Sequence, residues 1–369
     1  MHLPIPILSR ASRFAGPATA RLIYLAGAVG AERRAGSFLK ATRAQGPRPS
    51  LFHQQIQSSA SRRMLSTAST ASTPTVATQI KCFFDKNGTS TCQYVIWDQL
   101  SRKAAILDPV MDFNMVTGAI SFDNANQLLA FVTDENLHVE YILETHVHAD
   151  HLSSSQYLKK RLSSNPMVCI GAGITQVQKT FKTVYGLDDS FSTDGSQFDR
   201  LINDNESLPL GNLTISALHT PGHTPDHLAY YIGDAVFIGD SLFMPDIGSA
   251  RCDFPGGSAK MLFKSVRDRY WTLPPATRMM MGHDYPNGRE ARWEITIEEQ
   301  QRENKHVNLS VNEDQFIEMR TTRDAVLSPP KLIHFAIQVN MRAGKFEATS
   351  GDQQTLMVRY PLSVPKESL

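Results

Sequence analysis

The stretch ILETHVHADHLSSS, residues 142–155, places three histidines and one aspartate within six positions, directly behind an apolar run. Imidazole and carboxylate groups suit first-row divalent metals such as zinc and iron, and neighbouring ligands help because one turn can hold several of them at once. A lone histidine is usually structural, whereas four candidates so close together favour a metal site. These candidates are His146, His148, Asp150 and His151.

Other potential ligands follow apolar runs that we predict to be β-strands. Runs at residues 212–220, 235–241 and 278–284 each end beside a histidine or an aspartate. Each motif is weak by itself, because Gly-Asp and Pro-Gly are common in turns. Together they predict an α/β fold with a metal cluster at the mouth of a sheet. The residues concerned are His219, His223, His227, Asp240 and His283. We expect His219 and His227 to support the ligand loop through hydrogen bonds.

The remaining pattern predicts the order of the elements. Residues 80–110 have the turn signals of consecutive hairpins, and a helix and a strand are expected between Asp123 and Glu144. We expect the 146–151 cluster to open a helix that continues through residues 154–164. Residues 288–321 are predicted to be a helical extension. The predicted division is a leader at 1–78, a catalytic domain at 79–321 and a packed C-terminal extension at 322–369.

The charge of the chain is unevenly distributed. Residues 1–78 hold nine arginines and one lysine against a single acid, Glu32, and are rich in Ser and Ala. This composition is typical of a mitochondrial transit peptide, removed near residues 64–66, and predicts the mitochondrial matrix. The alternative is a disordered tail without an address. The apolar piece at 22–31 is too short to cross a bilayer, so no membrane anchor is expected.

The body of the chain has an acidic balance, with 27 basic and 35 acidic residues beyond position 78. It therefore offers no basic stripe for nucleic acid. The four cysteines, Cys82, Cys92, Cys169 and Cys252, lack C-x-x-C spacing, which argues against a zinc ribbon. We expect reduced thiols, Cys252 included. No G-x-G-x-x-G motif follows a strand, so no NAD or flavin site is predicted.

The motifs T-H-x-H-x-D-H, T-P-G-H-T, G-D and G-H-D-Y, in this order over residues 145–285, resemble those of the metallo-β-lactamase superfamily. The resemblance implies an α/β fold, an αββα sandwich of two mixed sheets with flanking helices. Within the superfamily, THVHADH, TPGHTPDH, GDSLFMPDIGSARCDFPGG and HDYPNGR are most similar to persulfide dioxygenases of the bacterial type. The sister family is glyoxalase II, hydroxyacylglutathione hydrolase, whose ligand set is nearly the same.

The dioxygenase resemblance implies one Fe(II) per chain, held by His146, His223 and Asp240. Two imidazoles and one carboxylate form a facial triad with open positions. The reaction implied is oxidation of the sulfane sulfur of glutathione persulfide by O₂ to sulfite and glutathione. The residues His148, Asp150, His151 and His283 would then orient and tune the iron.

The hydrolase resemblance implies a dinuclear zinc or zinc–iron site made from the same side chains. His148 would join the first ion, a second ion would use Asp150, His151 and His283, and Asp240 would bridge the two. The segment LFMPDIGSARCDFPGG favours the dioxygenase, and residues 322–369 do not resemble the glutathione-binding helical domain of glyoxalase II. A catalytically silent scaffold would predict eroded ligands, yet every motif position is filled. β-Lactam hydrolysis is disfavoured by the Asp150–His151 pair.

For the two carboxylates of glutathione, cationic or phenolic partners are required, and arginine offers bidentate geometry. We predict that Arg251, Tyr285 and Arg289 bind the substrate. No rhodanese-like module is present, so a separate persulfide-generating enzyme or sulfurtransferase would supply it. The sequence is compatible with a homodimer.

Overall fold

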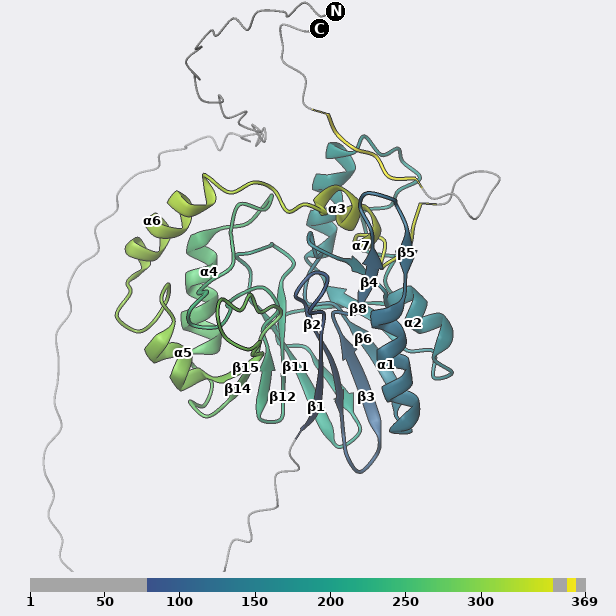
Figure 1. Cartoon of the computed structure of the whole chain (residues 1–369), viewed down its shortest axis with the longest axis horizontal. Coiled ribbons are helices and arrows are strands. Elements are labelled where there is room, and N and C mark those ends of the chain that lie inside the picture. The colour runs from purple at the N-terminus through teal and green to yellow at the C-terminus, as the bar shows by residue number, and fades with distance from the viewer. Residues whose placement is uncertain (1–77, 348–356, 363–369) are drawn as a thin grey trace, which may run out of the picture. The chain divides into compact units, whose positions relative to one another are not determined.

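The computed structural model describes residues 78–347 and 357–362, so the predicted leader lies outside the described residues. Two six-stranded sheets form its centre (Figure 1). The first has the order β1-β2-β3-β6-β8-β9 and the second runs from β10 to β15 in sequence order. Both are mixed, because β3, β6, β8 and β9 pair in parallel, as do β13 and β14, whereas the other pairs are antiparallel.

The strands of the first sheet are β1 Gln79–Phe84, β2 Cys92–Trp97, β3 Lys103–Leu107, β6 His138–Leu143, β8 Met167–Gly171 and β9 Arg200–Ile202. Those of the second are β10 Ser207–Leu210, β11 Leu213–His219, β12 Leu228–Ile232, β13 Ala235–Phe237, β14 Arg278–Met280 and β15 Glu294–Thr296. A small third sheet combines β5 Ile120–Ser121, β4 Val110–Phe113 and β7 Leu152–Ser153.

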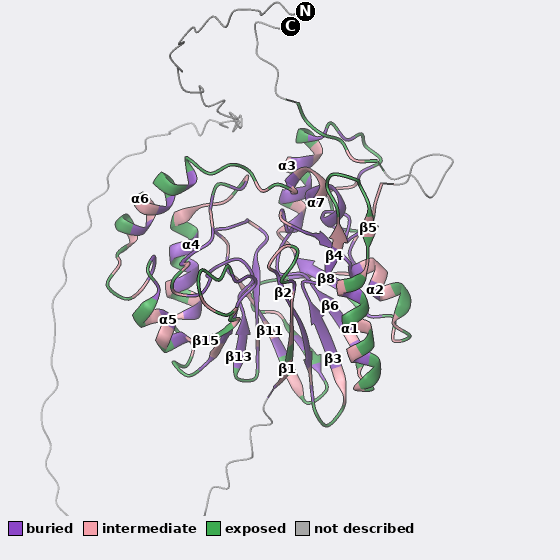
Figure 2. Ribbon diagram, in the orientation of Figure 1, coloured by how far each residue is buried: buried purple, intermediate pink, exposed green. Residues whose placement is uncertain are grey.

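The helices flank the two large sheets, with α1 and α2 beside the first and α4 and α5 beside the second (Figure 1). Their bounds are α1 Asp123–Asp134, α2 Ser155–Arg161, α3 Ile174–Val184, α4 Ala259–Ser265, α5 Ile297–Glu303, α6 Glu313–Asp324 and α7 Ile333–Asn340. A π-helical turn, Val266–Tyr270, continues α4. In Figure 2 the strands are mostly buried, whereas the outer sides of the helices are exposed.

The alternation of side chains along each strand builds the layers. Tyr94 of β2 packs with Tyr230 and Phe237 of the second sheet, so these side chains fill the space between the sheets. The next residue, Val95, belongs instead to a separate cluster that contains Leu128 of α1. A strand presents successive side chains to opposite faces, and each large apolar side chain buried here contributes about 1.5–3 kcal/mol. The layer order is therefore helix, sheet, sheet, helix, as predicted.

Two local predictions were wrong. The 146–151 cluster forms an irregular loop, and β7 separates it from α2, which begins only at Ser155. The 288–321 segment is not a continuous helix, because β15 pairs with β14 and buries Ile295 before α5 begins. Thr296 and Glu299 form a capping box at that point, which starts the helix and ends the strand. The predicted domain boundary at 321/322 falls inside α6.

Candidate metal centre

The ligand loops meet at one edge of the two sheets because the strands before them end there. In the first sheet Leu107 of β3 pairs with Leu143 of β6, and in the second Phe237 of β13 pairs with Met280 of β14. At this edge the backbone N–H of Leu228 donates to the carbonyl of Thr145 at 2.8 Å, which ties the two sheets together. The loops after β6, β11, β13 and β14 carry all seven motif side chains.

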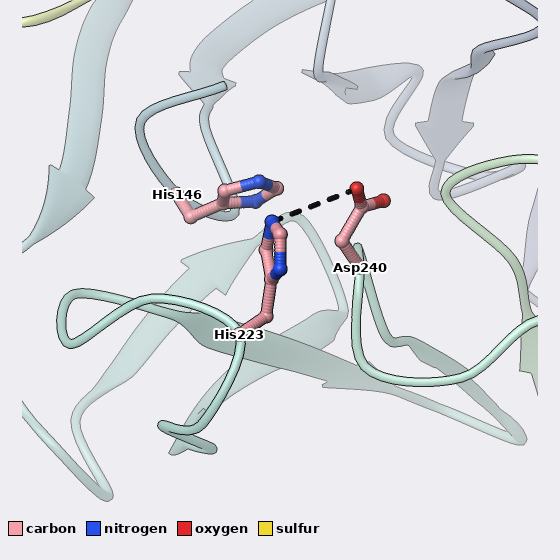
Figure 3. A group of neighbouring side chains, drawn as sticks. All are labelled: His146, His223 and Asp240. Carbon is pink, nitrogen blue, oxygen red and sulfur yellow. Dashed lines mark ion pairs between the residues drawn. The ribbon is translucent and has the colours of Figure 1, made fainter. Parts of the chain in front are cut away.

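His146, His223 and Asp240 form the primary donor group, in which one ligand atom from each residue lies within 4.8 Å of the others. Figure 3 shows the three side chains pointing toward one another. The His223 Nε2 and Asp240 Oδ2 atoms are 3.8 Å apart. All three residues are at least nine-tenths buried, and His146 Nε2 and Asp240 Oδ1 have no hydrogen-bond partner among the described residues.

Buried polar atoms without partners are costly, and a divalent cation at this point would satisfy them. Two neutral imidazoles and one carboxylate are a donor set suited to such a cation. Burial, together with the charges of the neighbouring imidazoles, lowers the pKa of His146 well below its usual value, which keeps its ring neutral for metal binding. The residues present therefore fit a bound metal ion.

Hydrogen bonds orient both imidazoles of the primary group. His223 Nδ1 donates to the carbonyl of Arg251 at 2.7 Å. His146 Nδ1 lies 3.0 Å from the hydroxyl of Thr145, which in turn donates to Asp108 at 2.9 Å. With the Nδ1 atoms used as donors, the Nε2 lone pairs of both rings face the site.

A second donor group shares Asp240 with the first. His283 Nε2 lies 3.1 Å from Asp150 Oδ2 and 3.4 Å from Asp240 Oδ1, and His151 lies beside Asp150. Burial by itself lowers the pKa of His283, but the carboxylates of Asp240 and Asp150 outweigh it and raise this pKa to about 10. The protonated ring thus balances two carboxylates, a role that a second cation would take over.

The His148 ring lies between those of His146 and His151, and two buried carboxylates contact its Nε2 atom. Its Nε2 atom is 3.0 Å from Asp108 Oδ1 and 3.7 Å from Glu144 Oε2. Burial lowers the pKa of His148, yet Asp108 chiefly raises it, to about 9. The Nδ1 atom is buried without a partner, so it remains available to a metal. His219 and His227 hydrogen-bond to Pro225 and Thr220, as supports of the loop.

Asp108 was not predicted as a site residue, although it directly follows β3 just as the metal loop follows β6. Its backbone φ of +46° lies in the left-handed region, which is rare outside glycine and marks a constrained position. Gly239, the glycine of the G-D motif, has a φ of +45°, and a Cβ there would lie 2.6 Å from the Thr145 hydroxyl. The position directly after a strand was a usable signal for Asp108.

Asn340 of α7 was missed as well, because it lies far away in the sequence. Its amide nitrogen donates to the carbonyls of His148 and His151 at 2.9 and 2.8 Å, and its oxygen accepts from the backbone N–H of Ser153 at 2.8 Å. The C-terminal helix therefore clamps the metal loop. No local pattern in the sequence around Asn340 could have indicated this contact.

A cavity of about 330 Å³ opens onto the primary group, with His223, Asp240 and Asp150 among its lining residues. Its apolar wall includes Phe243, Ile247, Leu327 and Pro330. Such a hollow, mostly apolar with a few polar groups, is typical of a small-molecule site.

The three predicted substrate residues differ in their surroundings. Tyr285 lines the cavity and stacks on His283, with ring centroids 5.6 Å apart. Arg251 also lines it, but its guanidinium is bound to both oxygens of Asp253 and to the carbonyl of Ser328.

Arg289 binds the carboxylates of Asp246 and Asp284, so its guanidinium braces the loop that holds His283. The expectation that it recognises substrate finds no support in these contacts.

All four cysteines are free. Burial raises the pKa of the Cys252 thiol, which favours the protonated thiol over the nucleophilic thiolate.

Within the described residues, no helix is long and apolar enough to span a membrane.

The family model of the metallo-beta-lactamase superfamily matches residues 90–283. A protein of Dictyostelium discoideum named glyoxylase B2 is 44% identical over 77% of this chain and 97% of its own length. The mitochondrial persulfide dioxygenase ETHE1 of Homo sapiens is 28% identical over 69% of this chain and 84% of its own length.

Among solved structures, ETHE1 from Myxococcus xanthus superposes with a TM-score of 0.58 at 28% identity, covering 72% of this chain and all of the other. The resemblance to the metallo-β-lactamase superfamily and the αββα fold, both expected from the sequence motifs, are confirmed by these matches. Fold, donor groups and family match agree, and the chain belongs to the metallo-β-lactamase superfamily.

Proposed function

We propose that the protein is a persulfide dioxygenase that acts on glutathione persulfide. The reaction consumes one persulfide, one O₂ and one water, and releases glutathione and sulfurous acid, which ionises to sulfite. The S–S bond breaks, the sulfane sulfur loses four electrons, and O₂ accepts them. No further oxidant or reductant is required for this balance.

The observation that carries the proposal is the primary donor group at the end of the cavity. It offers two imidazole nitrogens and one carboxylate oxygen within 4.8 Å of one another. When bound, Fe(II) in such a triad supplies redox chemistry and open positions for two reactants. The chain itself orients His146 through Thr145 and His223 through the Arg251 carbonyl. The apolar wall limits the access of water to the reacting sulfur.

Similarity supports the same function. The human relative and the Myxococcus structure are respectively named persulfide dioxygenase ETHE1 and ETHE1, and each shares 28% of its aligned residues with this chain. The segment GDSLFMPDIGSARCDFPGG, which runs from Gly239 to Gly257, contributes Asp240, Arg251 and Phe243 to the cavity lining.

A second candidate is a thioester hydrolase of the hydroxyacylglutathione type. The second donor group favours it, because Asp150, Asp240 and His283 lie within 4.8 Å of one another and could hold a second metal. Two metals would activate a hydroxide for attack on a thioester. The higher identity to the glyoxylase-named relative points in the same direction.

One experiment separates the two candidates. Protein purified without oxygen is analysed for metal, and then tested for O₂ uptake with glutathione persulfide and for cleavage of S-lactoylglutathione. One iron per chain with O₂ uptake and sulfite formation supports the dioxygenase. Two metals per chain with thioester cleavage and no O₂ uptake would replace it by the hydrolase.

We also propose that the protein works in the mitochondrial matrix beside a persulfide-generating enzyme or sulfurtransferase. The support is the arginine-rich leader, which has ten basic residues against one acid. Residues 1–78 fused to a fluorescent protein should direct it to mitochondria, and the same segment with its arginines changed to glutamine should not.

A further inference from the structure

Arg323 is an exposed residue on α6 whose side chain lines the cavity, and it therefore lies at the rim. Its guanidinium makes no hydrogen bond or ion pair with any residue that the structure describes. The other arginines near the site are already bound. Arg251 is held by Asp253, and the buried Arg320 binds Asp324 and the carbonyl of Ser249.

The position of Arg323 relative to the metal centre is well defined. Asp324, the next residue, accepts a hydrogen bond from the backbone N–H of Cys252 at 2.8 Å. The preceding carbonyl, that of Arg251, accepts from His223 of the primary donor group. Two hydrogen bonds thus connect the end of α6 to a candidate metal ligand.

The helix itself is also anchored. Asn312 and Gln315 form a capping box at its start, and Phe316 is fully buried. A capped helix with a buried anchor holds its backbone in place. The backbone of Arg323 is therefore fixed beside the cavity, from where its side chain lines the rim.

The two ends of the cavity differ in charge. The donor group provides a place for sulfur at one end, and Arg323 provides positive charge at the rim. Burial, with Arg320, Arg323 and Lys305 nearby, lowers the pKa of His306 to about 4, so this lining residue stays neutral. Its Nδ1 atom accepts from the backbone N–H of Ser249 at 2.9 Å. At the rim, an incoming anion meets an unpaired guanidinium.

We infer that Arg323 determines substrate specificity by binding a carboxylate of an acidic low-molecular-weight thiol derivative. The guanidinium fork fits a carboxylate through two parallel hydrogen bonds. The apolar wall formed by Phe243, Ile247, Leu327 and Pro330 covers the part of the ligand between carboxylate and sulfur. This inference rests on the proposed function for the identity of the sulfur group, but the carboxylate contact can be measured without turnover.

The test uses the full chain loaded with iron and the unreactive ligand S-methylglutathione in isothermal titration calorimetry. Arg323→Gln should weaken binding about tenfold, since one charge-assisted bidentate contact is lost, and Arg323→Lys should restore part of it. Arg302→Gln is the matched control, because Arg302 is an exposed α5 residue paired with Glu303. It should leave the dissociation constant unchanged.

Turnover provides an independent readout. Arg323→Gln should reduce the preference for glutathione persulfide over cysteamine persulfide, which has no carboxylate, by about tenfold in kcat/KM, mainly through KM. Equal affinity of wild type and Arg323→Gln for S-methylglutathione, or no binding to the wild type, would overturn the inference. If binding depends on Arg323 but no persulfide is oxidised, the proposed function fails and the carboxylate site stands.

Discussion

Asp108 Oδ1 lies 3.0 Å from His148 Nε2, so a carboxylate at the end of β3 orients an imidazole of the loop after β6. Both residues are buried. The same carboxyl group accepts from the backbone N–H and hydroxyl of Thr145, which contacts His146. One side chain of the first sheet therefore positions two candidate ligands.

Asp108→Asn should lower metal affinity about 10- to 100-fold, as is typical when a group that orients a ligand is altered. The amide nitrogen cannot accept the hydrogen bonds that the carboxylate accepts. Competition with a chromophoric chelator measures the affinity. Asp234→Asn, which alters an exposed partner of Arg278, is the control and should match the wild type. Unchanged metal affinity in Asp108→Asn would show that Asp108 does not position the metal ligands.

Asn340→Ala should lower the free energy of unfolding by about 2–3 kcal/mol, because three buried hydrogen bonds to the metal loop are lost. Denaturant titration of the metal-free protein measures this loss. The exposed Asn287→Ala serves as control. A variant as stable as the wild type would show that α7 does not hold the loop.

His283→Gln should leave about one iron per chain if the dioxygenase proposal is correct, because the primary donor group remains intact. Metal analysis after anaerobic loading checks the stoichiometry. A wild type with two metals that drops to one in the variant would contradict the proposal and support the hydrolase.

Asp98 should make stability depend on pH in the acid range. Burial raises its pKa, but hydrogen bonds from Ser101 and Asn212 outweigh this and lower it to about 2. Because the folded pKa lies below the unfolded value of about 3.9, the stabilisation is complete above that value and is lost as pH falls toward 2.

The stabilisation at neutral pH amounts to about 2 kcal/mol. Asp98→Asn should therefore be less stable than the wild type at pH 7, and the difference should shrink between pH 4 and pH 2. Chemical denaturation at several pH values measures it, with the exposed Asp134→Asn as control. A difference independent of pH would assign the effect to packing.

Most of the candidate metal ligands could be predicted from the sequence, because their motifs are short and directly follow strands. His146, His148, Asp150 and His151 lie within six positions, so their proximity needs no tertiary information. Strand periodicity placed the further histidines and Asp240 at strand ends, and strands of one sheet edge bring such residues together. The positions of β15 and of the loop before α2 were wrong, because pairing and packing override local helix propensity.

The sequence by itself determined the family, the layered fold and the side chains available to a metal, since these follow from residue type and spacing. Only the tertiary structure decided which groups are already paired. Arg251 and Arg289 meet carboxylates of their own chain, Arg323 meets none among the described residues, and Asn340 reaches a loop nearly two hundred residues earlier. Hydrogen bonding depends on distances of a few ångströms between remote segments, which no local pattern encodes.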